Sequence, residues 1–289
     1  MMGTLRALVI GAVLTVVTLP LMVVQWVLRK TGSDLAFRLP YLYHRGVACL
    51  MGLKIVVTGR PVRGSCLMVA NHASWLDIVV LSAVKPLSFI AKGEVGSWPV
   101  FGSLARLQRT VFIDRGNRAA TGRFSERIRA RLAEGDTLVL FAEGTSSDGN
   151  RVLPFKSALM GAAEPRQGHE VDDILVQPVT IAYTNLHGLP MGRMRRPSFA
   201  WYGDMELVPH LWQALSLGPV DVRVVLHEPI ALDRGLDRKA LATHCEKAVR
   251  HGLVRALGGH APDDALYPAP DANLNQSGRQ NPDHRHMAA

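Results

Sequence analysis

The longest apolar stretch of the chain lies near its N-terminal end. Residues 7–28 read ALVIGAVLTVVTLPLMVVQWVL and contain no charged side chain. About 20 apolar residues span the core of a bilayer as a helix, so this stretch predicts a membrane anchor. Pro20 interrupts the run, and a kinked or half-inserted helix is therefore an alternative to a straight span.

The segment after the anchor has a mixed character. Residues 34–53 combine Leu, Tyr, Arg and His, a pattern that predicts a second, amphipathic helix near the membrane. Basic residues are also more frequent just after the apolar run than before it, where Arg6 stands. Positive charge marks the cytoplasmic side of a membrane segment, so we expect the bulk of the chain on that side.

From residue 54 onward, short apolar runs alternate with segments of helical periodicity. We expect strands at 54–58, 67–70, 88–91, 111–113, 137–141, 175–182, 199–202 and 220–227. We expect helices at 75–84, 99–107, 118–133, 157–163, 210–216 and 237–257. Short apolar strands separated by helices predict an α/β fold, with a mixed β-sheet flanked by helices.

The same pattern divides the chain into three parts. We expect an N-terminal anchor with its amphipathic helix at 1–53 and one folded domain at 54–260. Residues 261–289 are rich in Pro, Asn, Asp, Gln and His without periodicity, which predicts a disordered tail. Within the domain, helix 118–133 has an apolar stripe at four-residue spacing, formed by Ala120, Phe124, Ile128 and Leu132.

Charge narrows the choice of partners. The net charge is +9, and eight arginines fall between residues 106 and 131. This density suits an anionic partner such as a membrane surface, a phosphate or an acidic protein, but a solvated helix surface explains it equally well. The anchor and the low aromatic content of 6% disfavour nucleic-acid binding. The three cysteines lack the spacing of metal ligands or of a disulfide framework.

A histidine and an aspartate follow the second predicted strand. In VANHASWLDIVV, residues 69–80, His72 and Asp77 lie five positions apart, which on one continuous helix separates them by about 140°. We therefore expect His72 in the turn before the helix, with Asp77 in the first turn reaching back. An Asp on one imidazole nitrogen raises the basicity of the other, which makes His72 a candidate general base. The structural alternative is a capping box, Ser74-x-x-Asp77.

A glycine-rich loop follows another predicted strand. From Gly144 to Gly149 the spacing is that of a phosphate-binding loop, but Asn150 and Arg151 replace its Lys and its Ser or Thr. A nucleotide-dependent enzyme is therefore disfavoured, and Gly149 is expected to serve a turn. The sequence has no G-x-S-x-G nucleophile elbow, so a covalent mechanism finds little support.

The strand at 111–113 is followed by two charged residues, Asp114 and Arg115. An arginine that leaves a strand end beside a base is well placed to hold an anionic headgroup or a donor phosphate. A salt bridge of Asp114 with Arg115 or Arg109 explains the same residues equally well.

Four stretches then occur in a fixed order: NHASWLD at 71–77, FIDRG at 112–116, FAEGTSSDG at 141–149 and VQPVTIAY at 176–183. They resemble the four motif blocks of the glycerolipid and lysophospholipid acyltransferase family, and the match covers roughly residues 66–183. The resemblance implies a membrane-associated enzyme that moves a fatty acyl group from a thioester to a lipid hydroxyl. No acyl-enzyme is required in such a reaction, in keeping with the missing nucleophile.

The resemblance also implies roles for single residues. His72 matches the general base of the family, and Asp77 matches the residue that orients it. Arg115 matches an arginine that helps to bind the acyl acceptor. The other matched positions help to hold the acceptor or to shape the site, and they are Glu143, Gly144, Thr145 and Pro178.

The implied partners are a lysolipid acceptor, the membrane surface and an acyl donor, either acyl-ACP or acyl-CoA. No cofactor and no metal ion are expected. We expect the enzyme at the inner membrane of a bacterium, with its catalytic domain facing the cytoplasm. A membrane-anchored module that binds lipid or acyl carrier without catalysis is the alternative from another class.

Two departures from the family pattern bear on the acceptor. Acyltransferases of lysophosphatidic acid usually carry F-P-E-G-T-R-S in the third block, whereas here Ala142 replaces Pro and Ser146 replaces Arg. The change removes a bidentate phosphate ligand, and the block looks instead like that of the lyso-ornithine lipid branch. Arg151 or Lys156 can restore a cation, so a 1-acylglycerol-3-phosphate acyltransferase remains the alternative.

Overall fold

The computed structural model describes residues 1–113, 118–163, 174–231 and 237–260. Its strands are β1 (Leu53–Thr58), β2 (Cys66–Ala70), β3 (Ser88–Lys92), β4 (Val111–Ile113), β5 (Thr137–Phe141), β6 (Leu175–Leu186), β7 (Leu189–Pro190), β8 (Val220–Leu226) and β9 (Ile230–Ala231). Within the described residues they form one sheet in the order β1-β8-β6-β2-β5-β3-β4, while β7 and β9 pair with β6.

Strand β2 lies near the middle of this sheet. Both of its neighbours, β5 and β6, run parallel to it, so the loops after β2 and β5 leave the sheet at the same edge. On the other side of β6, β8 runs antiparallel to β6 and parallel to β1. The sheet is therefore mixed, and the predicted fold class is confirmed.

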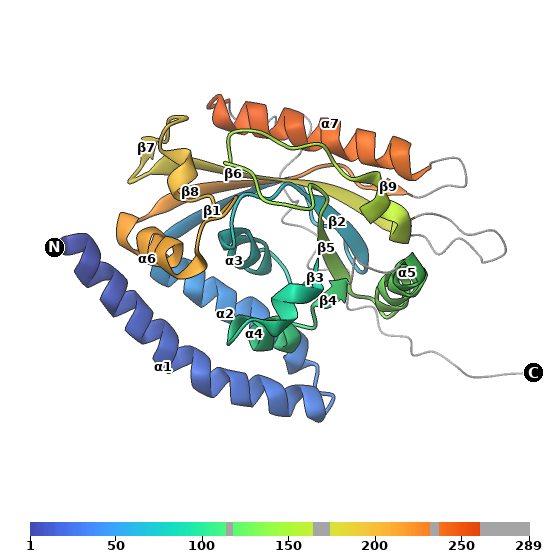
Figure 1. Cartoon of the computed structure of the whole chain (residues 1–289), viewed down its shortest axis with the longest axis horizontal. Helices are drawn as coiled ribbons and strands as arrows, with labels where there is room; N and C mark the ends of the chain where they lie inside the picture. Colours follow the sequence, from blue (N-terminus) through green and yellow to red (C-terminus); the bar gives the residue numbers. More distant parts are fainter. Residues whose placement is uncertain (114–117, 164–173, 232–236, 261–289) are drawn as a thin grey trace, which may run out of the picture.

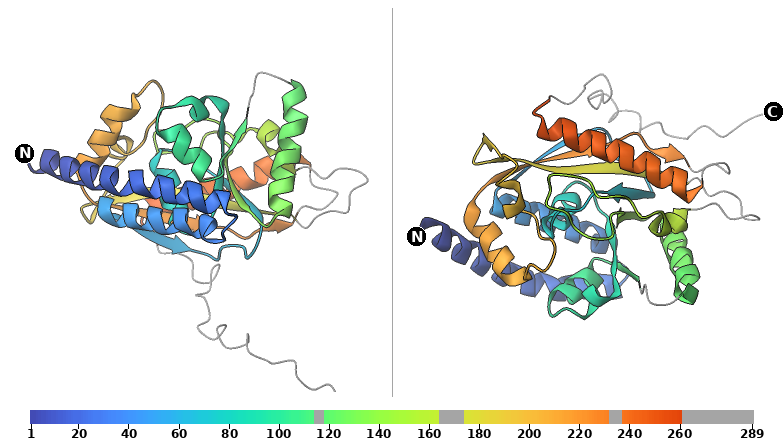
Figure 2. Two further views of the ribbon diagram at one scale, coloured as in Figure 1. Left: turned by 90° about the horizontal axis from the view of Figure 1, so that it is seen from below. Right: turned by 45° about the horizontal axis from the view of Figure 1, so that its top comes forward.

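Helices cover both faces of the sheet. The α-helices are α1 (Met2–Lys30), α2 (Leu35–Met51), α3 (Leu76–Ser82), α4 (Phe101–Leu107), α5 (Arg118–Ala133), α6 (Leu207–Leu217) and α7 (Arg238–Leu257). Helix α7 lies across one face, whereas α1, α2, α3, α4 and α6 gather on the other, and α5 stands beside the end of the sheet formed by β3 and β4 (Figure 1). Helices α1 and α2 lie side by side (Figure 2).

The alternation of side chains along β2 supplies both halves of the hydrophobic core. Cys66, Met68 and Ala70 pack into a cluster with residues of α1, α2 and α3. Leu67 and Val69 point the other way, into a cluster with residues of α5 and α7. All five side chains are fully buried, as expected for a strand covered on both faces.

Helix α1 packs along the domain over most of its length. Near its first turn, the Arg6 guanidinium donates to the carbonyl oxygens of Leu215 and Met51. Near its last turn, the Arg29 guanidinium donates to the carbonyl oxygen of Arg106. These contacts attach both ends of the helix to the side of the domain that carries α2, α4 and α6.

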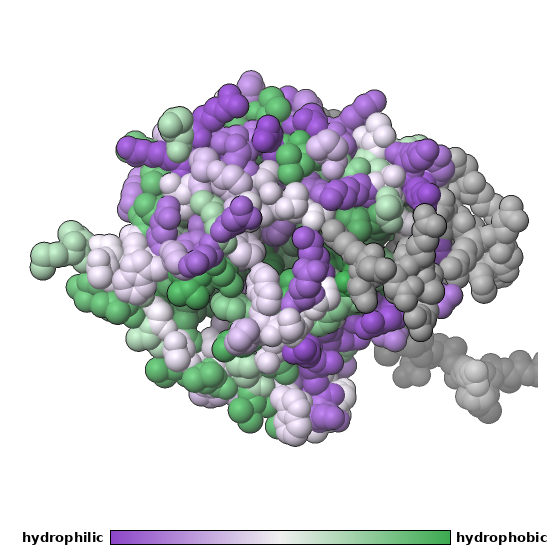
Figure 3. Space-filling model, viewed as in Figure 1, coloured by the Kyte–Doolittle hydropathy of each residue, from purple (hydrophilic) through white to green (hydrophobic). Residues whose placement is uncertain are grey.

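The same helix leaves a long apolar face exposed. Among the described residues, α1 is the one helix long and apolar enough to cross a membrane. The helix continues through Pro20 without a break. Apolar side chains gather over α1 in the space-filling view, while polar ones dominate over α7 (Figure 3). Exposed apolar residues of α1 include Leu8, Val9, Val13, Val16, Leu19, Val23, Val24 and Trp26.

Three sequence predictions differ from the structure. The strand expected at 199–202 is wrong: the chain forms the 3₁₀ turn η3 (Arg196–Ser198), and the N–H groups of Phe199 and Ala200 bond back into it. The apolar run there reflects burial rather than sheet pairing. The helix expected at 157–163 is the 3₁₀ helix η2 (Ser157–Ala163). The strand expected at 175–182 continues to Leu186, because β8 pairs with it that far.

Part of the arginine-rich segment has a structural role. Arg109 Nη1 lies 3.0 Å from Asp136 Oδ1, and the Arg131 Nε also contacts the Asp136 carboxylate. Arg109 therefore pairs with Asp136, and additionally with Glu134 at 3.3 Å. Asp114, Arg115 and the 261–289 tail lie outside the described residues. Of the predicted stripe on α5, Phe124, Ile128 and Leu132 are buried, and the Ala120 side chain is outside the description.

Candidate active site

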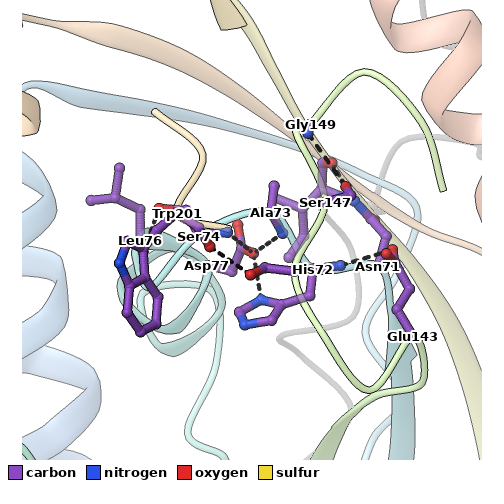
Figure 4. A network of polar contacts seen from close by, with 12 residues as sticks. Asn71, His72, Ala73, Ser74, Leu76, Asp77, Glu143, Ser147, Gly149 and Trp201 are labelled. Carbon is purple, nitrogen blue, oxygen red and sulfur yellow. Dashed lines mark hydrogen bonds and ion pairs between the residues drawn. The ribbon is translucent and has the colours of Figure 1, made fainter. Parts of the chain in front are cut away.

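The site begins where two parallel strands end. Ala70, the last residue of β2, is in register with Phe141, the last residue of β5. Asn71 and His72 therefore leave the sheet beside Glu143 (Figure 4). The Ser147 N–H donates to the His72 carbonyl at 2.9 Å, which ties the two loops together. The first and third sequence blocks thus meet at one edge of the sheet.

His72 and Asp77 are in direct contact, as the turn geometry predicts. The His72 Nδ1 lies 2.9 Å from Asp77 Oδ2, and the Asp77 carboxylate is fully buried. The same Oδ2 accepts from the backbone N–H groups of Ala73 at 2.8 Å and Ser74 at 2.9 Å. The capping arrangement and the His–Asp pair are therefore not alternatives, because one carboxylate does both.

This contact decides which nitrogen of His72 is free to act. A carboxylate accepts hydrogen bonds, so Nδ1 carries the proton that it donates to Asp77, and Nε2 keeps its lone pair. The imidazole stacks on Phe141 with ring centroids 4.0 Å apart and an angle of 18° between the planes. The side chain remains 19% exposed, so the ring is fixed on one face and still accessible.

Glu143 approaches His72 from the backbone side. Its Oε1 accepts the His72 N–H at 3.1 Å, and the residue is almost completely buried. Burial raises the pKa of Glu143 to about 8, and the His72 and Leu153 N–H groups offset this only in part. Glu143 does not line the cavity described below. The geometry therefore gives Glu143 a contact with the histidine backbone, on the side away from the open site.

The loop after Glu143 contributes backbone and small side chains. Gly144 has φ +70°, and a Cβ there would lie 3.0 Å from Lys156 Cδ and 3.2 Å from Nζ. Lys156, an exposed residue, thus lays its side chain over Gly144. Ser146 donates its hydroxyl to the Trp201 carbonyl at 2.5 Å. Gly149 has φ +76° in the turn that sequence predicts.

An apolar cavity of about 530 Å³ opens beside His72. Gly144, Thr145 and Ser146 line it next to the histidine. Helices α1, α2, α3, α4 and α6 also line it, with residues that include Leu14, Leu21 and Met22 of α1, Leu39 and Val47 of α2, and Phe101 and Leu104 of α4. The anchor helix therefore forms part of the cavity wall, which no pattern in the sequence indicates.

The other predicted residues take different positions. Pro178 is buried in β6 in register with Val69 of β2, and it does not line the cavity. Arg115 lies outside the described residues, so its predicted role stays a prediction. Tyr183, which sequence reasoning did not single out, donates its hydroxyl to Asp77 at 2.6 Å. Across the described ranges, no group of three His, Cys, Asp or Glu side chains is arranged to hold a metal ion.

The fold and this site define an acyltransferase. A family model described as Acyltransferase matches residues 54–182. A lyso-ornithine lipid O-acyltransferase of Brucella abortus is 49% identical over 261 residues, covering 90% of this chain and 98% of that protein. One of Rhizobium meliloti is 42% identical over 282 residues, covering 94% and 96%. The chain belongs to this acyltransferase family and is an enzyme.

A solved structure supports the fold separately. The 1-acyl-sn-glycerophosphate acyltransferase of Thermotoga maritima superimposes with a TM-score of 0.61 at 24% identity. The alignment covers 88% of this chain and 94% of that one, so the similarity includes nearly the whole fold.

Proposed function

We propose that this enzyme transfers a fatty acyl group from a thioester to the hydroxyl of a lysolipid, and that the lysolipid is lyso-ornithine lipid. The single observation that carries the proposal is the His72–Asp77 contact at the wall of an apolar cavity. A base beside an apolar cavity suits a reaction in which one reactant is a hydroxyl and the other is a fatty chain.

In the proposed reaction, His72 Nε2 takes the proton from the lipid hydroxyl. The hydroxyl oxygen attacks the thioester carbonyl carbon, a C–O bond forms and the C–S bond breaks. The thiolate leaves and takes the proton back from the imidazolium. Asp77 holds the tautomer and stabilises the imidazolium while it exists. This sequence needs neither an acyl-enzyme nor a cofactor beyond the acyl thioester.

The third sequence block, residues 141–149, supports an acceptor lipid whose headgroup is an amino acid. Ser146 stands where phospholipid enzymes usually have an arginine, and its hydroxyl is already engaged with the Trp201 carbonyl. One cation beside this loop is Lys156, whose side chain lies over Gly144. A lysine is a point charge that can match one carboxylate, whereas a phosphomonoester is better served by an arginine fork. The names of the relatives at 49% and 42% identity agree with this choice.

The exposed face of α1 supports a membrane location. Both ends of α1 bond to the domain, so the helix that contacts lipid also stays against the cavity. A helix held in this way lies along the interface with its apolar side in the bilayer, and we propose this arrangement for α1 instead of a separate span. The domain then rests on the cytoplasmic surface of the inner membrane.

An acceptor comparison with purified enzyme in detergent tests the proposal. Acyl-ACP and acyl-CoA are each supplied with lyso-ornithine lipid or with lysophosphatidic acid, and acylated product is measured. We expect transfer to lyso-ornithine lipid, its loss in His72→Ala, and its retention in His244→Ala, an exposed histidine of α7 on the other face of the sheet. Full activity of His72→Ala would contradict the mechanism, and a preference for lysophosphatidic acid would contradict the acceptor.

A further inference from the structure

Tyr183 connects strand β6 to the His72–Asp77 pair by a hydrogen bond. The residue belongs to β6, and its hydroxyl donates to Asp77 Oδ1 at 2.6 Å. The tyrosine is buried, with its ring parallel to that of Phe199 at a centroid separation of 6.4 Å. Burial together with the neighbouring Asp77 charge raises the pKa of Tyr183 well above its usual range, so the hydroxyl stays a donor.

The two oxygens of Asp77 are held by different partners. Oδ2 accepts from the His72 ring and from the backbone N–H groups of Ala73 and Ser74. These three donors come from one short turn. Oδ1 accepts from Tyr183, which among the described residues is its one hydrogen-bond donor. Tyr183 therefore holds the carboxylate oxygen that the turn does not hold.

Strand β6 also holds the other end of this turn. The Asn71 side chain donates to the Ile181 carbonyl at 3.0 Å and accepts from the Ile181 N–H at 2.8 Å. His72 thus sits between Asn71 and Asp77, and both of these neighbours are bound to β6. One rigid strand positions the histidine from two sides.

We propose that Tyr183 is a positioning residue of the catalytic site, acting on His72 through Asp77. This inference rests on the proposed function of the two residues. The hydroxyl holds the carboxylate in the plane that Nδ1 needs, and it draws part of the negative charge toward Oδ1. Partners that orient metal-ligating histidines change activity by about 10- to 100-fold when they are removed, and we expect an effect of similar size for a partner that orients the His72–Asp77 pair.

The principal test is Tyr183→Phe, assayed as kcat and KM across a pH range with lyso-ornithine lipid as acceptor. We expect kcat to fall about 10- to 100-fold while KM changes less than about twofold, because the hydroxyl does not reach the cavity. We also expect the acidic limb of the kcat/KM profile to move to higher pH. A carboxylate that has lost one donor keeps more negative charge and therefore stabilises the imidazolium more strongly.

A control and a double-mutant cycle separate positioning from packing. Phe199→Leu loosens the same ring contact without removing the hydroxyl, and it should leave the acidic limb in place. Tyr183→Phe should cost much less in an Asp77→Asn background, since its effect passes through Asp77. An equal loss in both backgrounds, or an unmoved acidic limb, would overturn the inference. If His72→Ala kept its activity, the proposed function itself would fail, which is a different result.

Discussion

Two buried carboxylates contact His72 from opposite sides, and they do so in unlike ways. Asp77 touches the ring, and its two oxygens accept four hydrogen bonds. Glu143 touches the backbone N–H, and burial leaves it with a pKa raised to about 8. Both come from sequence blocks that resemble motifs of the acyltransferase family. The contrast separates the two acidic residues by contact: Asp77 holds the imidazole, whereas Glu143 holds the backbone of the same residue.

The difference follows from the elements that carry the two residues. Asp77 lies in the first turn of α3, where free N–H groups converge on its carboxylate. Glu143 lies just after β5, where a strand end supplies few donors. If the proposed mechanism holds, the contact on the ring side of His72 serves the chemistry and the contact on the backbone side supports the loop. Four substitutions or measurements test this division.

The largest effect is expected for Asp77→Asn. The amide has nearly the same shape, but it favours the wrong imidazole tautomer, and a comparable change in a serine protease lowers kcat by about 10⁴-fold. We expect a fall in kcat of about 10³- to 10⁴-fold with KM little changed. Steady-state kinetics with both substrates varied will check it, and a loss below tenfold would contradict the assignment of Asp77.

Activity should depend on the shape of the Glu143 side chain rather than on its charge. Glu143→Gln keeps an oxygen that can accept the His72 N–H, and we expect its activity to stay within about threefold of the parent. Glu143→Ala leaves that N–H buried without an acceptor, and we expect a loss of about 1–3 kcal/mol in the free energy of unfolding with a reduced kcat. A raised KM for the acceptor in Glu143→Gln would instead mean that the carboxylate binds the headgroup.

The raised pKa of Glu143 also predicts how stability varies with pH. In the unfolded chain the carboxyl ionises near its ordinary value of 4.5, whereas in the fold it keeps its proton to about 8. Between these values the folded state binds the additional proton, so stability falls as pH rises, by at most about 1.4 kcal/mol per pH unit. Urea unfolding at pH 5 to 9 measures this slope, and Glu143→Gln should reduce it.

The smallest effect is expected for Phe141, whose ring lies against His72 between the two sides. Phe141→Leu keeps an apolar surface but removes the stacking, which is worth about 0.5–1.5 kcal/mol for aromatic pairs. We expect kcat to fall by a few fold without a change in the pH profile. A shift of the acidic limb in this variant would indicate that the stack, and not Asp77 alone, sets the basicity of His72.

Local patterns in the sequence predict the fold class and the contact between His72 and Asp77. The spacing of His72 and Asp77 excludes contact on one helix and therefore requires the turn that is found. The hydroxyl of Tyr183 could not be predicted, because it reaches Asp77 from a strand 106 positions further along the chain. The direction of Glu143 depends on the register of β2 with β5, and register is a tertiary property.

The remaining differences have similar causes. Phe199 and Ala200 of the apolar run at 199–202 are buried, but their N–H groups bond within a turn. The apolar pattern reports burial rather than sheet pairing. Hydropathy likewise marks α1 as a membrane helix without indicating that one of its sides faces a cavity. The polar attachments of α1 at Arg6 and Arg29 involve carbonyl groups of distant segments, which leave no trace in sequence.

The position of helix α1 between lipid and cavity also bears on how the enzyme is extracted and engineered. Its cavity side carries Leu14, Leu21 and Met22, and its outer side carries Val9, Val13 and Val16. A detergent that replaces lipid on the outer side has an alkyl tail of the same apolar character as the cavity wall, so activity is expected to fall as detergent is raised above the amount needed for extraction. Exchange of α1 with a relative's helix would change the exposed apolar face and the cavity wall at the same time.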